Sequence, residues 1–147
     1  MSEYADTIKV TVSNLKKMKR AQGSMFDYFT GDLDDGQLGS DLSAVSSILG
    51  ILFYTSSVAG IVSLAAGLVG GLLSSSDKKT LQNQLLMGYM DMDQKIDYLE
   101  DNNMDMAEIK FPFAKYLVDG KKVTFVIGRG IFGSFHPKNG GGWMTKN

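Results

Sequence analysis

The chain contains no cysteine and a single histidine, His136. The absence of cysteine excludes disulfides and thiolate metal sites, and it is compatible with either side of a membrane. The one histidine precedes Pro137 in a glycine-rich stretch, where a structural or solvent-facing role is more common than a catalytic one. We therefore expect no catalytic residue, no metal site, no cofactor and no small-molecule substrate, and the sequence predicts that the protein is not an enzyme.

Two stretches contain parts of functional motifs but are incomplete. Asp91, Asp93 and Asp97 are spaced like calcium ligands, but they fall inside a helical pattern and lack the glycine turn and later glutamate of a calcium loop. We interpret them as the solvated face of a helix. Gly128-Arg129-Gly130 lacks the Lys-Ser/Thr pair of a phosphate loop. The basic C-terminal side chains are not arranged on one predicted helix or sheet face, so nucleic acid is not an expected partner.

Charged side chains are also missing from residues 42–76. A helix that crosses a membrane needs about 20 predominantly apolar residues, so this segment is long enough. It fits either one helix of roughly 30 residues or a helical hairpin broken near residues 54–57, whose arms are then too short to cross a bilayer alone. Because few other residues remain to enclose it, we expect lipid or neighbouring copies of the chain to cover this segment.

Small residues recur in the apolar segment at four-residue steps, in one row that starts at Ala59 and a second that starts at Ser56. This spacing places small side chains on one helix face and lets two helices approach closely. Large apolar residues cover the rest of the helix. The predicted membrane-insertion or helix-packing residues are Ser56, Ala59, Gly60, Ser63, Leu64, Gly67, Leu68 and Gly71.

Apolar side chains at helical spacing predict an amphipathic helix on each side of the apolar segment, over residues 3–29 and 78–107. The β-branched run at residues 7–12 leaves a short strand open as an alternative. Residues 30–40 are predicted to be a linker, after which Ser40 or Asp41 caps the apolar helix. Ser76 or Asp77 is expected to cap the helix that follows it.

Charge is unevenly distributed along the chain. The middle of the first predicted helix carries a basic cluster, Lys16, Lys17, Lys19 and Arg20. Residues 77–109 carry eight acidic and three basic side chains, and residues 110–147 carry seven basic and one acidic. The cluster fits a solvated face, or contact with anionic lipid or an acidic helix. If the first and third predicted helices pair antiparallel, the basic cluster faces the acidic stretch.

The C-terminal part is predicted to contain strands. Pro112 is expected to end the helical part, and Asp119-Gly120 predicts a two-residue type I′ turn between two apolar runs. The predicted fold is therefore mainly α: amphipathic helices flank a long apolar helix or helical hairpin, with a small C-terminal β-hairpin. We divide the chain into a helical region, 1–109, with its central apolar segment, and a region, 110–147, with the hairpin and a tail rich in glycine and aromatic residues.

These features predict a membrane-inserting, self-associating helical protein that forms a pore or conduit, with the lipid bilayer and its own copies as partners. The plan is similar in outline to helical pore-forming toxins and pore-forming colicins, although no motif carries the likeness, and a viral ejection or lysis protein satisfies the same constraints. The N-terminus is not a secretion signal, so we expect no cleavable signal peptide and association with a membrane after release in soluble form. The alternative is a structural subunit of a particle, tube or filament, as in a virion, that buries the apolar helix between copies.

Overall fold

The computed structural model describes residues 1–145, apart from the side chain of Leu72. The elements in chain order are β1 (Ser2–Thr11), α1 (Val12–Thr30), α2 (Asp35–Ser43), the short η1 (Ser46–Ile48), α3 (Leu49–Phe53), α4 (Val58–Gly67), the π-helical η2 (Leu68–Leu72), α5 (Ser75–Asp101), β2 (Met104–Val118), β3 (Lys121–Val126), β4 (Ile131–Pro137) and β5 (Met144–Thr145). The fold is α+β, because a five-stranded antiparallel sheet accompanies the helices. The prediction of a mainly α fold with one small C-terminal hairpin is therefore wrong. The last two residues of the predicted tail lie outside the described residues.

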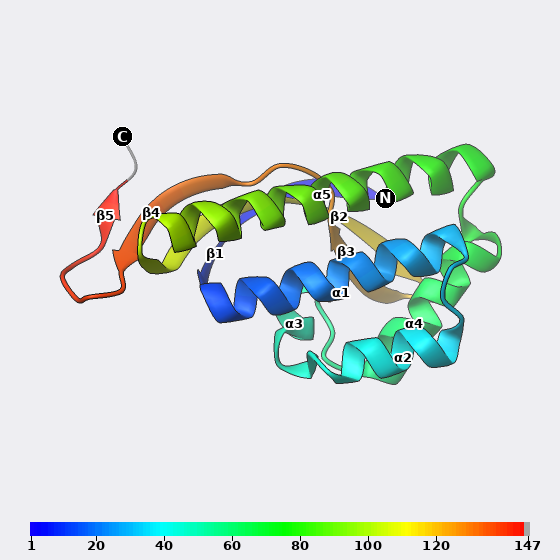
Figure 1. The fold of residues 1–147 in the computed structure, drawn as a ribbon. Helices are drawn as coiled ribbons and strands as arrows, with labels where there is room; N and C mark the ends of the chain where they lie inside the picture. Colours follow the sequence, from blue (N-terminus) through cyan, green and yellow to red (C-terminus); the bar gives the residue numbers. More distant parts are fainter. Residues whose placement is uncertain (146–147) are drawn as a thin grey trace.

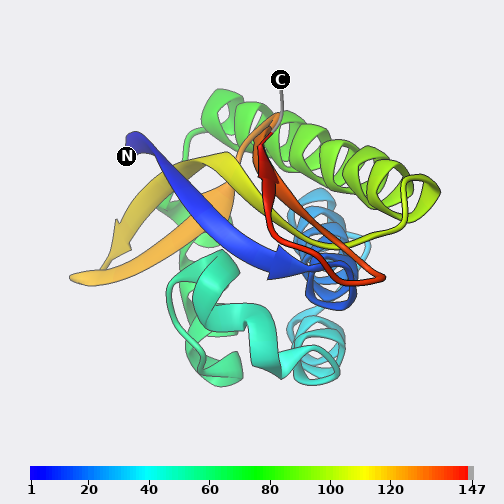
Figure 2. The same ribbon diagram turned by 90° about the vertical axis from the view of Figure 1, so that its left-hand side faces the viewer.

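The helices are arranged around one long pair. Figure 1 shows α1 and α5 side by side in front of the strands, with α2, α3 and α4 below them. Figure 2 shows the strong twist of the strands, and α1 seen nearly end-on between α5 and α2. α1 is therefore in contact with other elements on more than one side, which explains why eight of its residues are buried.

The fifteen-residue strand β2 is the centre of the sheet. β1 pairs with residues 106–115 along one edge of β2, whereas the other edge is shared by β4 on the first half and β3 on the second. Pro112, which has no N–H to donate, lies between these two halves, and its carbonyl oxygen accepts a hydrogen bond from the Ile127 N–H at 3.0 Å. The prediction that Pro112 ends the helical part is wrong, because the helical part ends at Asp101.

The first predicted helix, residues 3–29, is a strand followed by a helix. Residues 2–11 form β1, so the alternative of a short strand at 7–12 describes this stretch better. α1 starts after Thr11, whose hydroxyl oxygen accepts a hydrogen bond from the Asn14 N–H at 3.0 Å and so caps the helix. Pairing with β2, far along the chain, decides between two patterns that overlap in this sequence.

Two predicted helix starts are also wrong. Residues 30–40 are not a linker, because α2 occupies most of the stretch and starts one residue after its cap, Asp34. α5 is capped by Ser74, whose hydroxyl accepts a hydrogen bond from the Asp77 N–H at 3.1 Å, rather than by Ser76 or Asp77. In both places a short polar side chain does cap the helix. Several neighbouring residues have such a side chain, and the sequence did not show which of them is the cap.

The apolar segment 42–76 forms neither one long helix nor a hairpin with two long arms. It is divided among the end of α2, η1, the five-residue α3, the ten-residue α4, η2 and the first two residues of α5. The chain does break near the predicted position, since Tyr54 has a φ of 73° and Ser57 caps α4. Its buried large side chains are Leu42, Val45, Ile48, Leu49, Leu52, Phe53, Ile61, Leu64 and Leu68. The expectation that lipid or other copies must cover the segment is therefore wrong for these side chains.

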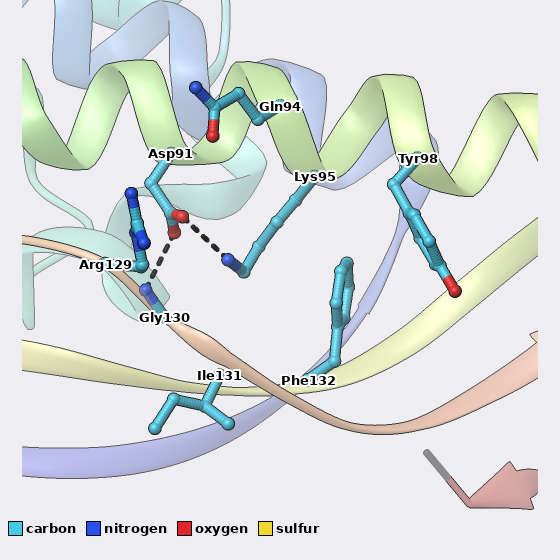
Figure 3. A pocket seen from close by; sticks show the side chains of 8 residues that line it. All are labelled: Asp91, Gln94, Lys95, Tyr98, Arg129, Gly130, Ile131 and Phe132. Carbon is cyan, nitrogen blue, oxygen red and sulfur yellow. Dashed lines mark hydrogen bonds and ion pairs between the residues drawn. The ribbon is translucent and has the colours of Figure 1, made fainter. Parts of the chain in front are cut away.

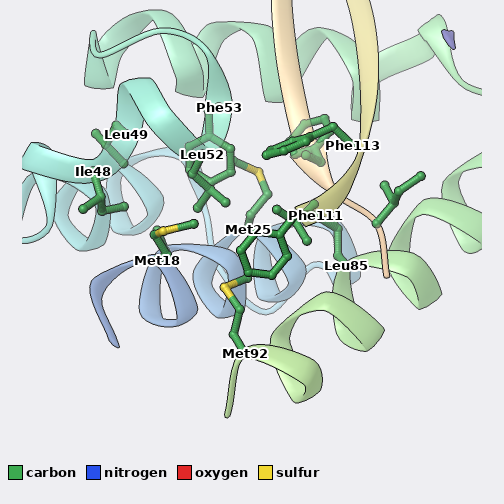
Figure 4. Packing of buried hydrophobic residues seen from close by; sticks show 14 of the residues in the cluster. Met18, Met25, Ile48, Leu49, Leu52, Phe53, Leu85, Met92, Phe111 and Phe113 are labelled. Carbon is green, nitrogen blue, oxygen red and sulfur yellow. The ribbon is translucent and has the colours of Figure 1, made fainter. Parts of the chain in front are cut away.

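The core lies where the apolar segment, the two long helices and the sheet meet. Figure 4 shows side chains from all of these elements around Phe111, including Met25 of α1 and Met92 of α5. Phe53 contacts Phe125 of β3 with ring centroids 6.0 Å apart. Each such side chain contributes about 1.5–3 kcal/mol when fully buried, so the apolar segment is a major part of the stability of this domain.

α1 and α5 pack antiparallel, which is the pairing of the first and third predicted helices that the charge distribution suggested. Lys16 near the start of α1 pairs with Glu100 near the end of α5 at 3.2 Å. At the opposite end of the pair, the side-chain amide of Gln82 donates to the carbonyl oxygen of Phe29 at 2.6 Å. The exposed ion pair contributes at most about 1 kcal/mol, so apolar packing between the helices supplies most of the stability and the charges help to set their register.

Candidate functional site

A groove of about 700 Å³ lies between α2 and α4 at the protein surface. It is lined by Asp35, Gly39 and Ser43 of α2 and by Val58, Ala59, Val62, Ser63 and Ala66 of α4. The two helices direct larger side chains to the core instead: Leu38, Leu42, Ile61 and Leu64. The outer side of α4 therefore presents mostly small side chains, and we call this surface the α2–α4 groove.

The row of small residues predicted from the sequence lies on the outer side of α4. Ala59 and Ser63 are exposed and line the groove, and Gly67 is half-buried at the end of the helix. Gly71 does not continue the row, because it lies in η2 with a non-helical φ of 158°. The row is thus a surface feature of this fold, with its first two members open to a partner.

The other predicted packing residues are divided between the core and the surface. Leu64 and Leu68 are 6% and 1% exposed, so neither is available to lipid or to a partner in this fold. Gly60 is half-buried in the first turn of α4, where its N–H donates to the capping hydroxyl of Ser57 at 3.0 Å. Ser56 is exposed in the connection before α4.

The basic cluster of α1 is partly used within the chain. Besides the Lys16 pair, Lys19 Nζ lies 2.6 Å from Asp93 Oδ1 on α5, and this hydrogen bond raises the pKa of Lys19 above its usual value. Lys17 and Arg20 have no ion-pair partner within residues 1–145. Half of the cluster is therefore committed to α5, which leaves less free positive charge for lipid than the sequence indicates.

One end of the α2–α4 groove is acidic. The hydroxyl of Tyr28 donates to Asp35 Oδ1 at 2.7 Å. Burial of the phenol, together with this hydrogen bond, raises the pKa of Tyr28 to about 12. Burial raises the pKa of Asp27 nearby, and the neighbouring charges of Asp32 and Asp41 add to the effect. The groove thus offers a contact surface, apolar along α4 with a carboxylate on α2.

Sequence analysis missed a second feature, a buried ion pair on α5. Asp91, interpreted above as solvated, is buried and lies 2.7 Å from the ammonium of Lys95, which is also buried. The Gly130 N–H, from the stretch dismissed as an incomplete phosphate loop, donates to Asp91 Oδ2 at 2.7 Å. The signal in the sequence was the position of both residues beside the apolar stripe of the helix, next to Met92 and Ile96.

Within residues 1–145, no three His, Asp or Glu side chains gather as they would around a metal ion. His136 instead pairs with Asp105, its Nδ1 lying 2.8 Å from the carboxylate. Over the same residues no individual helix combines the length and apolar composition of a membrane span, although α2 and the helical stretch Ser46–Phe53 do so jointly, across an 85° bend.

No family model, curated protein or solved structure matches this chain.

Proposed function

We propose that this chain is a structural subunit that assembles with copies of itself through the α2–α4 groove. The observation that supports this most directly is that the two faces of α4 differ: small residues such as Ala59 and Ser63 lie at the surface, and larger ones lie in the core. Helices with small side chains at four-residue spacing pack closely, because no bulky groups separate their backbones. The same face of a second α4 meets this requirement.

The chemistry of the groove fits a second copy of the chain. α4 has no charged side chain, so two crossing α4 helices bring no charge to the centre of the contact. Asp35 belongs to α2, and its carboxylate is already bonded to the Tyr28 hydroxyl. A two-fold contact uses one patch on both subunits, so a single sequence supplies both sides.

Sedimentation velocity over a range of protein concentrations tests the proposal. The wild-type chain is expected to form dimers or larger species as its concentration rises. Ser63→Arg adds a long charged side chain to the lining of the groove, where it keeps the backbones of two α4 helices apart, and it should weaken association at least tenfold. Asn83→Arg on α5, also exposed but outside the groove, is the matched control and should assemble like the wild type. A wild-type protein that stays monomeric at high concentration, or Ser63→Arg that assembles normally, contradicts the proposal.

A membrane-inserting oligomer is the second candidate, because the uncharged α4 lies between two interruptions of regular structure. Residues 54–57, which precede α4, are not helical. After α4, the backbone at Gly71 also departs from helical geometry. Insertion must release Ile61, Leu64 and Leu68 from the core, and exposing these three aliphatic side chains to water before they reach lipid costs roughly 5–9 kcal/mol. That is comparable to the whole stability of a typical domain, so insertion requires a trigger that unfolds this part of the protein.

Leakage from dye-loaded liposomes separates the two candidates. Structural assembly gives no leakage, whereas insertion gives leakage that Ser63→Asp suppresses, because a carboxylate inside the bilayer costs about 2.5–3.5 kcal/mol. Ser63 is the suitable position because it is exposed, so the substitution leaves the core intact. Leu64→Asp would instead disrupt the core, and the resulting loss of assembly or of leakage would not distinguish the two candidates.

A further inference from the structure

The buried ion pair of α5 forms one wall of a hollow on the protein surface, separate from the α2–α4 groove. The hollow has a volume of about 420 Å³, within the range of small-molecule sites. It is lined by Asp91, Gln94, Lys95 and Tyr98 of α5 and by residues 129–132 before and within β4. Figure 3 shows the side chains of Asp91, Lys95 and Tyr98 directed from α5 toward that segment.

The ion pair is fixed in place from both sides. Asp91 accepts hydrogen bonds on both carboxylate oxygens, from Lys95 Nζ and from the Gly130 N–H. Gly130 holds this position because a Cβ there would lie 2.7 Å from the ring of Phe111, so any other residue would push the backbone away from Asp91. Both carboxylate oxygens therefore already have a partner within the chain, and one of these partners is a cation.

The cationic side of the hollow still has free donors. An ammonium group has three N–H donors. One of those on Lys95 is used by Asp91, and the Phe132 ring lies 5.1 Å from its nitrogen, which leaves at least one donor for a ligand. Arg129 is exposed and has no ion-pair or hydrogen-bond partner within residues 1–145. With one carboxylate and two cations, the lining has a net positive charge and favours an anion.

The remaining wall is aromatic. The rings of Tyr98 and Phe132 lie with their centroids 5.4 Å apart, and Phe135 packs against both. Tyr98 is 46% exposed, so its ring offers a face to a bound molecule. A ligand that satisfies both walls combines an anionic group with a flat apolar body.

We propose that the hollow between α5 and β4 binds a small aromatic carboxylate. Its carboxylate accepts hydrogen bonds from Arg129 and Lys95, and its ring lies against Tyr98. A planar guanidinium suits a carboxylate because it can donate two parallel hydrogen bonds. This inference departs from the sequence-based expectation of no small-molecule partner, and it does not depend on self-assembly.

The test uses 2-naphthoate as the probe and its neutral amide, 2-naphthamide, as the matched control, in an NMR titration of the ¹⁵N-labelled full chain. Naphthoate is expected to shift the amide signals of Gly130 and Ile131 in a saturable way. Naphthamide keeps the ring and removes the charge, so it should bind at least fivefold more weakly, given that hydrogen bonds to charged groups are the stronger ones.

Two arginine variants complete the experiment. Arg129→Gln should weaken naphthoate binding roughly tenfold, which is the loss expected for a charged hydrogen-bonding partner. Arg20→Gln removes an exposed arginine outside the hollow and should bind like the wild type. Both positions are exposed, so neither substitution should unfold the protein. A dispersed amide spectrum of each variant will show that the fold is kept. Equal binding of the amide, unchanged affinity of Arg129→Gln, or shifts confined to other surfaces would overturn the proposal.

Discussion

Gly88 is the position where sequence and structure predict opposite effects of one substitution. From the sequence, Gly88 is a weak point in a long helix, and replacement by alanine should stabilise the protein by about 1 kcal/mol. In the structure Gly88 is buried inside α5, facing α1 and β3. An added Cβ would lie 2.8 Å from Gln22 Nε2 and 3.1 Å from the carbonyl oxygen of Val126.

The size of the expected loss of stability follows from the hydrogen bonds that the Gln22 amide and the Val126 carbonyl group make. Gln22 Nε2 donates to the carbonyl oxygens of Val126 at 2.6 Å and Leu85 at 3.2 Å, and all of these atoms are buried. Displacing the amide leaves buried polar groups unsatisfied at about 1–3 kcal/mol, and crowding the backbone of Val126 adds roughly 1–3 kcal/mol. After subtracting about 1 kcal/mol for helix propensity, Gly88→Ala should destabilise the protein by roughly 1–5 kcal/mol.

Urea unfolding followed by circular dichroism measures this change. Gly36→Ala is the control, because Gly36 is exposed in α2 and its added Cβ would lie 3.5 Å from the nearest atom, an ordinary contact. The control should be neutral or stabilised by up to about 1 kcal/mol. If Gly88→Ala is as stable as the wild type or more so, the close packing of α5 on Gln22 and Val126 is wrong.

Three further predictions concern the ion pair, a tyrosine and the hairpin. Lys95→Met should destabilise by about 3–5 kcal/mol in urea unfolding, because it leaves the Asp91 carboxylate buried without its cation, and adding Asp91→Asn should recover part of the loss. Because the pKa of Tyr28 is raised to about 12, its contribution to stability is complete below pH 10 and is lost as the pH rises toward 12. Thermal unfolding over this range should therefore show a steeper loss for the wild type than for Tyr28→Phe, and equal slopes contradict the assignment. Gly120→Ala should cost about 1–2 kcal/mol because the φ of Gly120 is 78°, whereas Gly142→Ala in open space should change the unfolding free energy by less than about 0.5 kcal/mol.

Local chemistry was enough to predict some elements of this protein. The Asp119-Gly120 turn was predicted correctly, because both residues adopt the positive φ that a type I′ turn requires and apolar runs flank them. The apolar stripe of α5 and the break near Tyr54 were likewise visible in the sequence. In each case the signal lies within a few neighbouring residues, so no distant contact was needed to interpret it.

Tertiary structure decided the rest. Residues 2–11 satisfy helical and strand patterns together, and their pairing with β2 selects the strand. The apolar segment could enter lipid or a core, and the sheet and the two long helices together enclose most of its large side chains, which no pattern within the segment reveals. The Asp91–Lys95 pair becomes a wall of a hollow because residues 129–132 lie against it. Local sequence thus determined short-range geometry, whereas which surfaces are buried depended on contacts between residues far apart in the chain.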